Sequence, residues 1–164
     1  MPAALAIVAI VAGRWWLAAA LVFCLAGDVL LLPQVDRFRG GLGAFLLAHL
    51  AFIGGLLTQP LQPQRAGFAA GAFVLVVVVA PRVLRAVPAS LRPPVVAYMV
   101  VLVALNLVAA LTTSVLALAG ASCFAVSDSL LAWNRFVRPL PGGRLAVMVT
   151  YHLAIGLLTL SLAF

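Results

Sequence analysis

The chain consists of long apolar runs separated by short polar segments that contain most of the Arg and Pro residues. Six of these runs have the length of roughly 17–25 residues that a helix needs to cross a bilayer. They are Trp15–Pro33, Gly41–Thr58, Ala66–Val83, Pro94–Leu111, Ser114–Trp133 and Arg144–Phe164. A further apolar stretch, Pro2–Ala12, would cover only about 16 Å at the helical rise, half of the hydrocarbon core. The pattern predicts an all-α, polytopic transmembrane helical bundle with six full spans and a partial N-terminal one.

The composition supports a membrane protein over a soluble one. Hydrophobic residues make up 66% of the 164 residues and charged residues only 8%, against about 25% charged in soluble domains. So few charges could not cover the surface of a water-soluble globule. The net charge of +7 comes from ten Arg placed mainly between apolar blocks, where they determine topology and contact lipid phosphate. We therefore expect no nucleic-acid partner.

The loops are too short to hold a soluble domain, so residues 1–164 are expected to form one transmembrane domain. The partial span Pro2–Ala12 lacks the basic region of a signal peptide, and we expect a further N-terminal segment to precede it. Alternating spans place eight Arg on one side and only Arg14 and Arg65 on the other. By the positive-inside rule the Arg-rich loops are cytoplasmic and the C-terminus is outside, in a multi-pass protein of the cell (inner) membrane.

Two segments of the chain resemble each other. Gly27–Leu31 is followed by His49, and Ser127–Leu131 is followed by His152. The aspartates Asp28 and Asp128 are 100 residues apart and the two histidines 103. Both aspartates lie on spans that run inward, and each histidine lies on the next span. This arrangement is typical of a parallel internal repeat.

Ionisable residues inside a span are costly, and by default they suggest a functional site. Asp28 and Asp128 each lie about 7–8 Å from the cytoplasmic end of their span, and His49 and His152 about 12–14 Å from the same side. Tyr98 and Tyr151 belong to the same leaflet. If the helices form one bundle, these side chains meet in one cavity.

Simpler interpretations remain open for each residue taken alone. An aspartate near a span end can cap the helix or pair with a nearby Arg such as Arg37 or Arg135. A lone histidine in a span is often only hydrogen-bonded. Asp36, in a loop beside Arg37, is interpreted as solvated.

Two carboxyl groups that meet in a medium of low dielectric cannot both ionise easily, so one keeps its proton while the other is charged. Such a pair is suited to general acid–base hydrolysis at a lipid bond.

Both segments carry family-like signatures. The first consists of Leu25–Asp28, Leu31–Pro33, Phe38, Gly43–Leu46 and His49–Leu50. The second consists of Gly120–Ala121, Phe124, Ser127–Asp128, Leu131–Ala132, Arg135–Phe136 and Tyr151. Over nearly the whole chain these residues resemble the YhhN-like, lysoplasmalogenase family of integral membrane proteins, whose members usually have about eight helices.

The resemblance implies that the chain hydrolyses the vinyl-ether bond of a lysoplasmalogen, a lysophospholipid, to a fatty aldehyde and a glycerophospho-base. It implies that Asp28 and Asp128 are the catalytic acid–base pair and that no metal or cofactor is required. The residues expected to bind substrate or water are His49, Tyr98, Ser127, Arg135, Tyr151 and His152.

Three other functions are compatible with intramembrane acids and histidines. The leading alternative is a small secondary transporter that uses these residues for proton coupling. An intramembrane aspartyl protease would also need two membrane aspartates, but its GxGD signature is absent around Asp28. A haem protein with His49 and His152 as ligands is the third.

Overall fold

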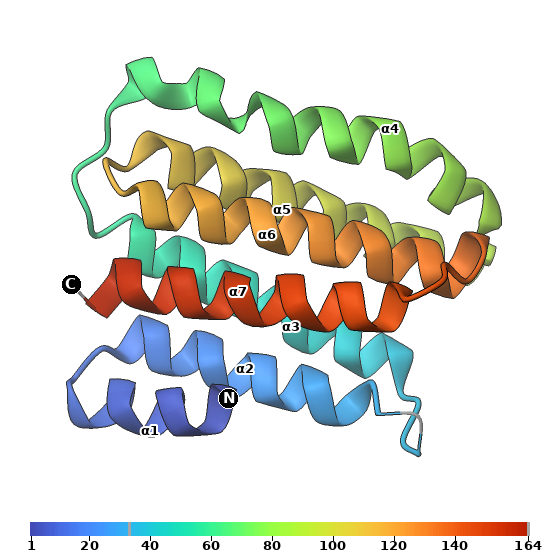
Figure 1. The fold of residues 1–164 in the computed structure, drawn as a ribbon, viewed down its shortest axis with the longest axis horizontal. Coiled ribbons are helices and arrows are strands. Elements are labelled where there is room, and N and C mark those ends of the chain that lie inside the picture. The colour runs from blue at the N-terminus through green and yellow to red at the C-terminus, as the bar shows by residue number, and fades with distance from the viewer. Residues whose placement is uncertain (33, 164) are drawn as a thin grey trace.

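The computed structural model describes residues 1–32 and 34–163. Pro33 and Phe164, which end two of the expected spans, lie outside the described residues. The described residues form seven α-helices, which run side by side through the molecule in Figure 1. They are α1 (Pro2–Val11), α2 (Trp15–Leu30), α3 (Phe38–Leu56), α4 (Ala70–Ala86), α5 (Arg92–Leu111), α6 (Val115–Ala132) and α7 (Gly143–Ala163). The all-α prediction is confirmed.

Three short helical segments extend the long helices. A 3₁₀ segment, η1 (Pro63–Ala69), leads directly into α4, and a second, η2 (Ala89–Leu91), leads into α5. A π-helical turn, η3 (Trp133–Val137), continues α6. With these extensions, the described part of the chain contains five helices long and apolar enough to cross a membrane: α3, η1 with α4, η2 with α5, α6 with η3, and α7.

The prediction of six full spans is wrong for Trp15–Pro33. Helix α2 has only 16 residues, or about 24 Å of length, and like α1 it is a shorter apolar helix. The chain leaves the helix because it turns back tightly into α3. The N–H of Asp36 donates to the Leu32 carbonyl at 2.8 Å, and the N–H of Arg37 donates to the Leu30 carbonyl at 2.9 Å. Asp36 takes a φ of 40° in this turn, a conformation that Asp tolerates better than most residues.

The other five expected spans are confirmed as helices with shifted ends. With the short segments included, Ala66–Val83 becomes Pro63–Ala86, Pro94–Leu111 begins five residues earlier at Ala89, and Ser114–Trp133 ends four residues later at Val137. At the start of α6 the Ser114 Oγ accepts a hydrogen bond from the Ala117 N–H at 3.2 Å. This N-cap explains why the helix begins at Val115.

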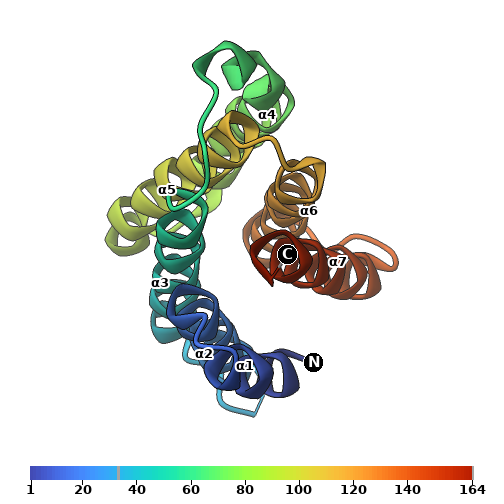
Figure 2. The same cartoon turned by 90° about the vertical axis from the view of Figure 1, so that its left-hand side faces the viewer.

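Two helix hairpins form the two sides of the bundle. Helix α2 packs along α3, and α6 packs along α7. Figure 2 shows α5 beside α3, with α4 covering α5 and α6 from outside. Only 11% of the apolar window of the α4 span is buried, against 44% for α3. Helix α4 is therefore the outermost long helix and presents most of its surface to lipid.

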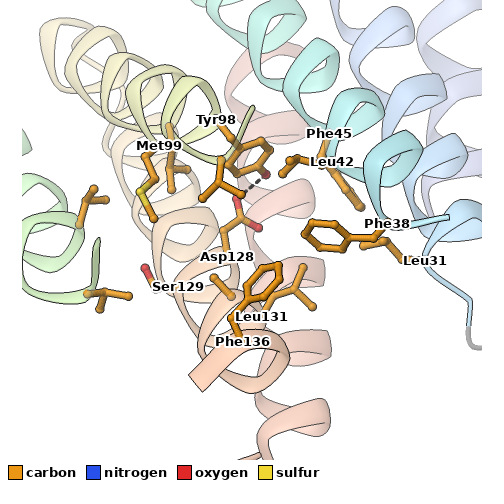
Figure 3. A pocket seen from close by; sticks show the side chains of 15 residues that line it. Leu31, Phe38, Leu42, Phe45, Tyr98, Met99, Asp128, Ser129, Leu131 and Phe136 are labelled. Atoms are coloured by element: carbon orange, nitrogen blue, oxygen red, sulfur yellow. Dashed lines mark hydrogen bonds between the residues drawn. The ribbon is translucent and has the colours of Figure 1, made fainter. Parts of the chain in front are cut away.

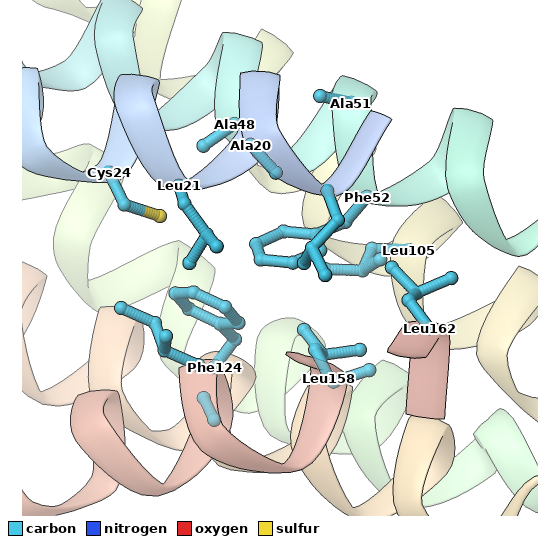
Figure 4. Packing of buried hydrophobic residues seen from close by; sticks show 14 of the residues in the cluster. Ala20, Leu21, Cys24, Ala48, Ala51, Phe52, Leu105, Phe124, Leu158 and Leu162 are labelled. Carbon is cyan, nitrogen blue, oxygen red and sulfur yellow. The ribbon is translucent and has the colours of Figure 1, made fainter. Parts of the chain in front are cut away.

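The main core lies between the two hairpins and α5. Figure 4 shows side chains from all five helices meeting there, and Leu21, Phe52, Leu105, Phe124 and Leu158 are fully buried. A smaller apolar cluster around Val83, Val87 and Val95 packs against η3 at the other end of α4 and α5. Between these two clusters α3, α4, α5 and α6 leave the space described next.

Candidate active site

An apolar pocket lies between α3, α4, α5 and α6 (Figure 3). It contains about 660 Å³ of empty space including its open mouth, but only about 60 Å³ admits the centre of a water molecule, so the pocket is narrow. Its wall consists of Leu, Val, Met, Ala and Phe side chains apart from the polar residues Tyr98, Asp128 and Ser129. Such a pocket, apolar with a few converging polar groups, is the usual form of a small-molecule site.

Asp128 is the acidic residue of this pocket. Its Oδ2 accepts a hydrogen bond of 2.7 Å from the Tyr98 hydroxyl of α5, drawn in Figure 3. The same oxygen lies 3.4 Å from Nε2 of His49 on α3. The side chain of Asp128 is 12% exposed and that of His49 only 1%. A carboxyl group on α6 is thus held between polar groups of two other helices.

The helix that carries His49 also orients its ring. Nδ1 lies 2.6 Å from the Phe45 carbonyl one turn earlier on α3. This contact directs the opposite ring nitrogen, Nε2, toward Asp128. Nε2 is buried and has no hydrogen-bond partner among the described residues.

Asp28 lies in a different polar group, between α2 and α7. Its side chain is partly buried, and its electrostatic neighbours include Tyr151 and His152. The Tyr151 hydroxyl lies beside Asp28 and Cys24, close enough for a hydrogen bond to either, but it has no partner with full hydrogen-bond geometry among the described residues. Nδ1 of His152 lies 2.8 Å from the Met148 carbonyl, so this histidine is anchored one turn back along its helix as His49 is.

A row of aromatic rings connects the two polar groups. Successive ring centroids are 5.2 Å apart from Tyr98 to His49, 4.8 Å from His49 to Phe124, 5.8 Å from Phe124 to Tyr151 and 5.2 Å from Tyr151 to His152. Cys24, which is buried, lies within electrostatic range of both aspartates. The two carboxyls therefore belong to one buried region but are not joined by a direct contact within residues 1–32 and 34–163.

The residues expected at the site are distributed over this region. The structure brings Asp128, Tyr98 and His49 into contact, and of the expected site residues only Asp128 and Tyr98 line the apolar pocket. Ser127 faces α7, where its hydroxyl donates to the Val147 carbonyl at 3.2 Å. Asp28, His49, Asp128 and His152 were expected to line one common cavity. Of these four residues, only Asp128 lines this pocket.

Two charged residues that lie far apart in the sequence meet next to the pocket lining. Asp36 was interpreted as solvated, but its Oδ1 lies 2.9 Å from an Arg135 guanidinium nitrogen. Arg135 also lies over the Phe38 ring, 5.2 Å from its centroid. Phe38 and Phe136 meet edge to face at 5.2 Å, and both line the pocket. No sequence signal pairs these residues, because the contact depends on how the α2–α3 turn approaches η3.

The described part of the chain contains no cluster of three or more His, Cys, Asp and Glu side chains that could hold a metal ion.

These features define the class of protein: an integral membrane protein of several apolar helices, with carboxyl, imidazole and phenol groups collected inside the bundle. The chain belongs to the YhhN family, whose model matches residues 1–162, as the resemblance of its two signatures predicted.

Named relatives agree with this assignment. The chain is 36% identical over 146 residues to human lysoplasmalogenase TMEM86B, a match that covers 87% of this chain and 61% of the human protein. It is 40% identical over 135 residues to a lysoplasmalogenase of Mycobacterium bovis, covering 76% of this chain and 51% of that protein. The chain therefore spans between half and two thirds of the length of these relatives. No solved structure matches the chain.

Proposed function

We propose that this protein is a lysoplasmalogenase, a membrane-embedded hydrolase that cleaves the vinyl-ether bond of lysoplasmalogens to a fatty aldehyde and a glycerophospho-base. Membership of the YhhN family and the names of the relatives support the reaction. The single observation that carries the proposal is the narrow apolar pocket with the Asp128 carboxyl in its wall.

The pocket suits the hydrocarbon chain of such a lipid. The Val, Leu and Met side chains of α3, α4 and α5 supply an apolar wall, so the hydrocarbon chain can pass from the bilayer into the pocket without exposure to water. A chain lying in the pocket would bring its vinyl-ether end near Asp128. Helix α4, which is mostly lipid-exposed, gives the substrate a route from the bilayer.

The proposed chemistry uses two carboxyl groups in different protonation states. One of Asp28 and Asp128 protonates the vinyl carbon, and the ionised partner stabilises the resulting cation and orients a water molecule. The hemiacetal that forms then breaks into aldehyde and alcohol. The buried region that contains both aspartates, with its tyrosines and histidines, supplies the groups that would position water.

The substrate phosphate is assigned to the Arg-rich end of the bundle. Arg135 lies over the ring of Phe38, which lines the pocket, and its guanidinium group can bind a phosphate in the bidentate manner. With the Arg-rich loops cytoplasmic, the substrate would enter from the inner leaflet.

Purified protein in detergent tests the function directly. We expect it to release aldehyde from a lysoplasmalogen and none from the matched lysophospholipid whose ether bond is saturated. Asp28→Asn and Asp128→Asn should each lower turnover by at least roughly 10²-fold. The matched control is Asp36→Asn, the same change in an exposed turn, which should stay within a few-fold of the unmodified protein.

A transporter would give the opposite result. It would release no aldehyde in detergent and would act only across a sealed membrane. Folded protein that leaves the vinyl ether intact would contradict the proposal, as would full turnover in Asp128→Asn.

A further inference from the structure

The contacts of His49 determine where its hydrogens lie. A backbone carbonyl can only accept a hydrogen bond, so the 2.6 Å contact between Nδ1 and the Phe45 carbonyl requires a hydrogen on Nδ1. In a neutral imidazole the other nitrogen, Nε2, then carries a lone pair. This lone pair points away from its own helix and toward α6.

Nε2 faces the Asp128 carboxyl at a separation too short for a water molecule to lie between them. The two atoms are 3.4 Å apart, and the side chains are 1% and 12% exposed. A bare lone pair opposite an ionised carboxylate would leave a buried acceptor unsatisfied beside a negative charge, which is costly. One proton between them removes this cost, whether it resides on Asp128 and is donated to Nε2 or resides on Nε2 and is donated to the carboxylate.

Tyr98 completes this arrangement from the third helix. Its hydroxyl donates to Oδ2 of Asp128 at 2.7 Å, so the carboxyl has one hydrogen-bond donor from α5 and one shared proton on the α3 side. The other titratable groups near the pair are Cys24 on α2 and Tyr151 on α7. Thiol and phenol groups are ordinarily neutral at pH 7, so the proton shared by Asp128 and His49 is the mobile one.

We infer that Asp128 and His49 together hold the proton that the reaction uses, so that Asp128 is the acid of the aspartate pair and His49 is its proton-sharing partner. The inference rests on the proposed function for its role in catalysis, whereas the shared proton is inferred from the contacts alone. Asp28 does not line the pocket, and the proposed reaction requires it to be the ionised partner.

The proton balance of the reaction closes with this assignment. The shared proton moves from Asp128 to the vinyl carbon that is not bound to oxygen, and the carbon–carbon double bond becomes single. Water adds to the other carbon, and its released proton returns to the Asp128–His49 pair, where Nε2 or the carboxylate accepts it. The hemiacetal then passes its hydroxyl proton to the glycerol oxygen as their carbon–oxygen bond breaks. The pair ends with the one proton it had at the start.

Replacement of His49 by Gln separates a proton-sharing role from a structural one. The Gln amide nitrogen can reach the position of Nε2 and donate to Asp128, but it cannot take up a proton. The matched variant is His152→Gln, since His152 has the same anchor one turn back along its helix and lies on the Asp28 side.

The expected results differ between the two variants. In His49→Gln we expect kcat to fall by roughly 10²-fold, at the lower end of acid–base effects, with KM little changed. The alkaline fall of kcat should begin at lower pH, because Asp128 alone must then retain the proton. In His152→Gln the loss should be smaller and the alkaline fall unmoved. Equal losses, or the same alkaline fall in His49→Gln as in unmodified protein, would overturn the inference.

A second measurement needs no catalysis. The chain has only two histidines, so ¹⁵N NMR of the imidazoles in detergent gives two sets of signals, assigned with His152→Gln. We expect Asp128→Asn to change the Nε2 signal of His49 and Asp36→Asn to leave it unchanged. An Nε2 signal unchanged by Asp128→Asn would refute the shared proton. If the signal changes but the unmodified protein releases no aldehyde, the proposed function fails and the shared proton stands.

Discussion

The region around Asp128 and the region around Asp28 use similar residues in different ways. Asp128 accepts a hydrogen bond from Tyr98, faces a buried His49 and lines an apolar pocket. Asp28 lies outside that pocket, beside a Tyr151 hydroxyl that has no partner among the described residues, and near the more exposed His152. Two partners hold the Asp128 carboxyl beside the pocket, and this position suits it to transfer a proton. Asp28 has fewer fixed partners, and its proposed role is to stabilise a positive charge.

The comparison also shows how the two similar segments are combined. Asp128, from the second segment, faces His49 of the first, and Asp28, from the first segment, lies near His152 of the second. Both histidines contact the carbonyl four residues earlier through Nδ1. The internal repeat remains a prediction, but this exchange of partners means that neither hairpin would form a complete acid–histidine pair by itself.

Removal of the carboxyl groups should give the largest effect. We expect Asp128→Asn to lower kcat by about 10³–10⁴-fold and Asp28→Asn by about 10²-fold, within the range for a lost acid or base. The difference arises because an amide in place of the Asp128 carboxyl could not donate a carboxylic proton, whereas an amide in place of the Asp28 carboxylate would remove only a charge. Because the groups act as a unit, the double variant should be little slower than Asp128→Asn. Aldehyde release at saturating substrate measures this ranking, and a slower Asp28→Asn would reverse the assignment of the acid.

The glycines of the two hairpins should differ in their effect on stability. A Cβ at Gly120 would lie 2.9 Å from Leu158 Cγ and 3.0 Å from the Leu158 backbone nitrogen of α7, so the helices themselves would have to separate. A Cβ at Gly27 would meet only the Phe45 ring, at 2.6 to 2.8 Å, and a side chain can shift more easily than a backbone.

We therefore expect Gly120→Ala to destabilise the protein by about 1–3 kcal/mol, the usual range for overpacking, and Gly27→Ala by less. Thermal unfolding of the two variants in the same detergent measures the difference. A lower Tm for Gly27→Ala would show that Phe45 is held more rigidly than the α6–α7 contact.

Much of the fold could be predicted from the sequence because bilayer thickness imposes a length on each apolar run. The end of α2 could not, since it depends on backbone hydrogen bonds at Asp36 and Arg37 that composition does not reveal. A similar depth of Asp128, Tyr98 and His49 was predictable from their positions along the spans, and the three side chains are in contact in the structure. The pocket was not predictable, because its walls depend on which helices become neighbours.

Removal of the two tyrosine hydroxyls should lower kcat less than removal of the carboxyl groups, and by different amounts in the Asp128 and Asp28 regions. Tyr98→Phe removes the 2.7 Å hydrogen bond to Asp128. The Asp128 carboxyl becomes charged as its proton leaves, and hydrogen bonds to charged groups contribute about 1.5–3 kcal/mol. We expect at least a roughly tenfold fall in kcat, since about 1.4 kcal/mol corresponds to tenfold. Tyr151→Phe removes a hydroxyl that lies beside Asp28 and Cys24 without full hydrogen-bond geometry among the described residues, so it should cost less. Equal losses would place the Tyr151 hydroxyl in the reaction as well.

Removal of the ion pair between Asp36 and Arg135 should have the smallest effect on catalysis. Asp36 and Arg135 form an ion pair at 2.9 Å, with the side chains 57% and 43% exposed, and exposed pairs contribute only about 0–1 kcal/mol. A substrate phosphate that binds Arg135 must compete with Asp36 for the same guanidinium group. Asp36→Asn should therefore lower KM by at most about fivefold, which is about 1 kcal/mol, with kcat unchanged. Because the pair is exposed, the change should shrink as salt is added.

Arg85→Gln, which alters the net charge on an exposed part of α4, is the control and should leave KM and its salt dependence as they are. A KM that rises in Asp36→Asn would mean that the ion pair holds the mouth open, so that Arg135 needs Asp36 to stay beside the Phe38 ring.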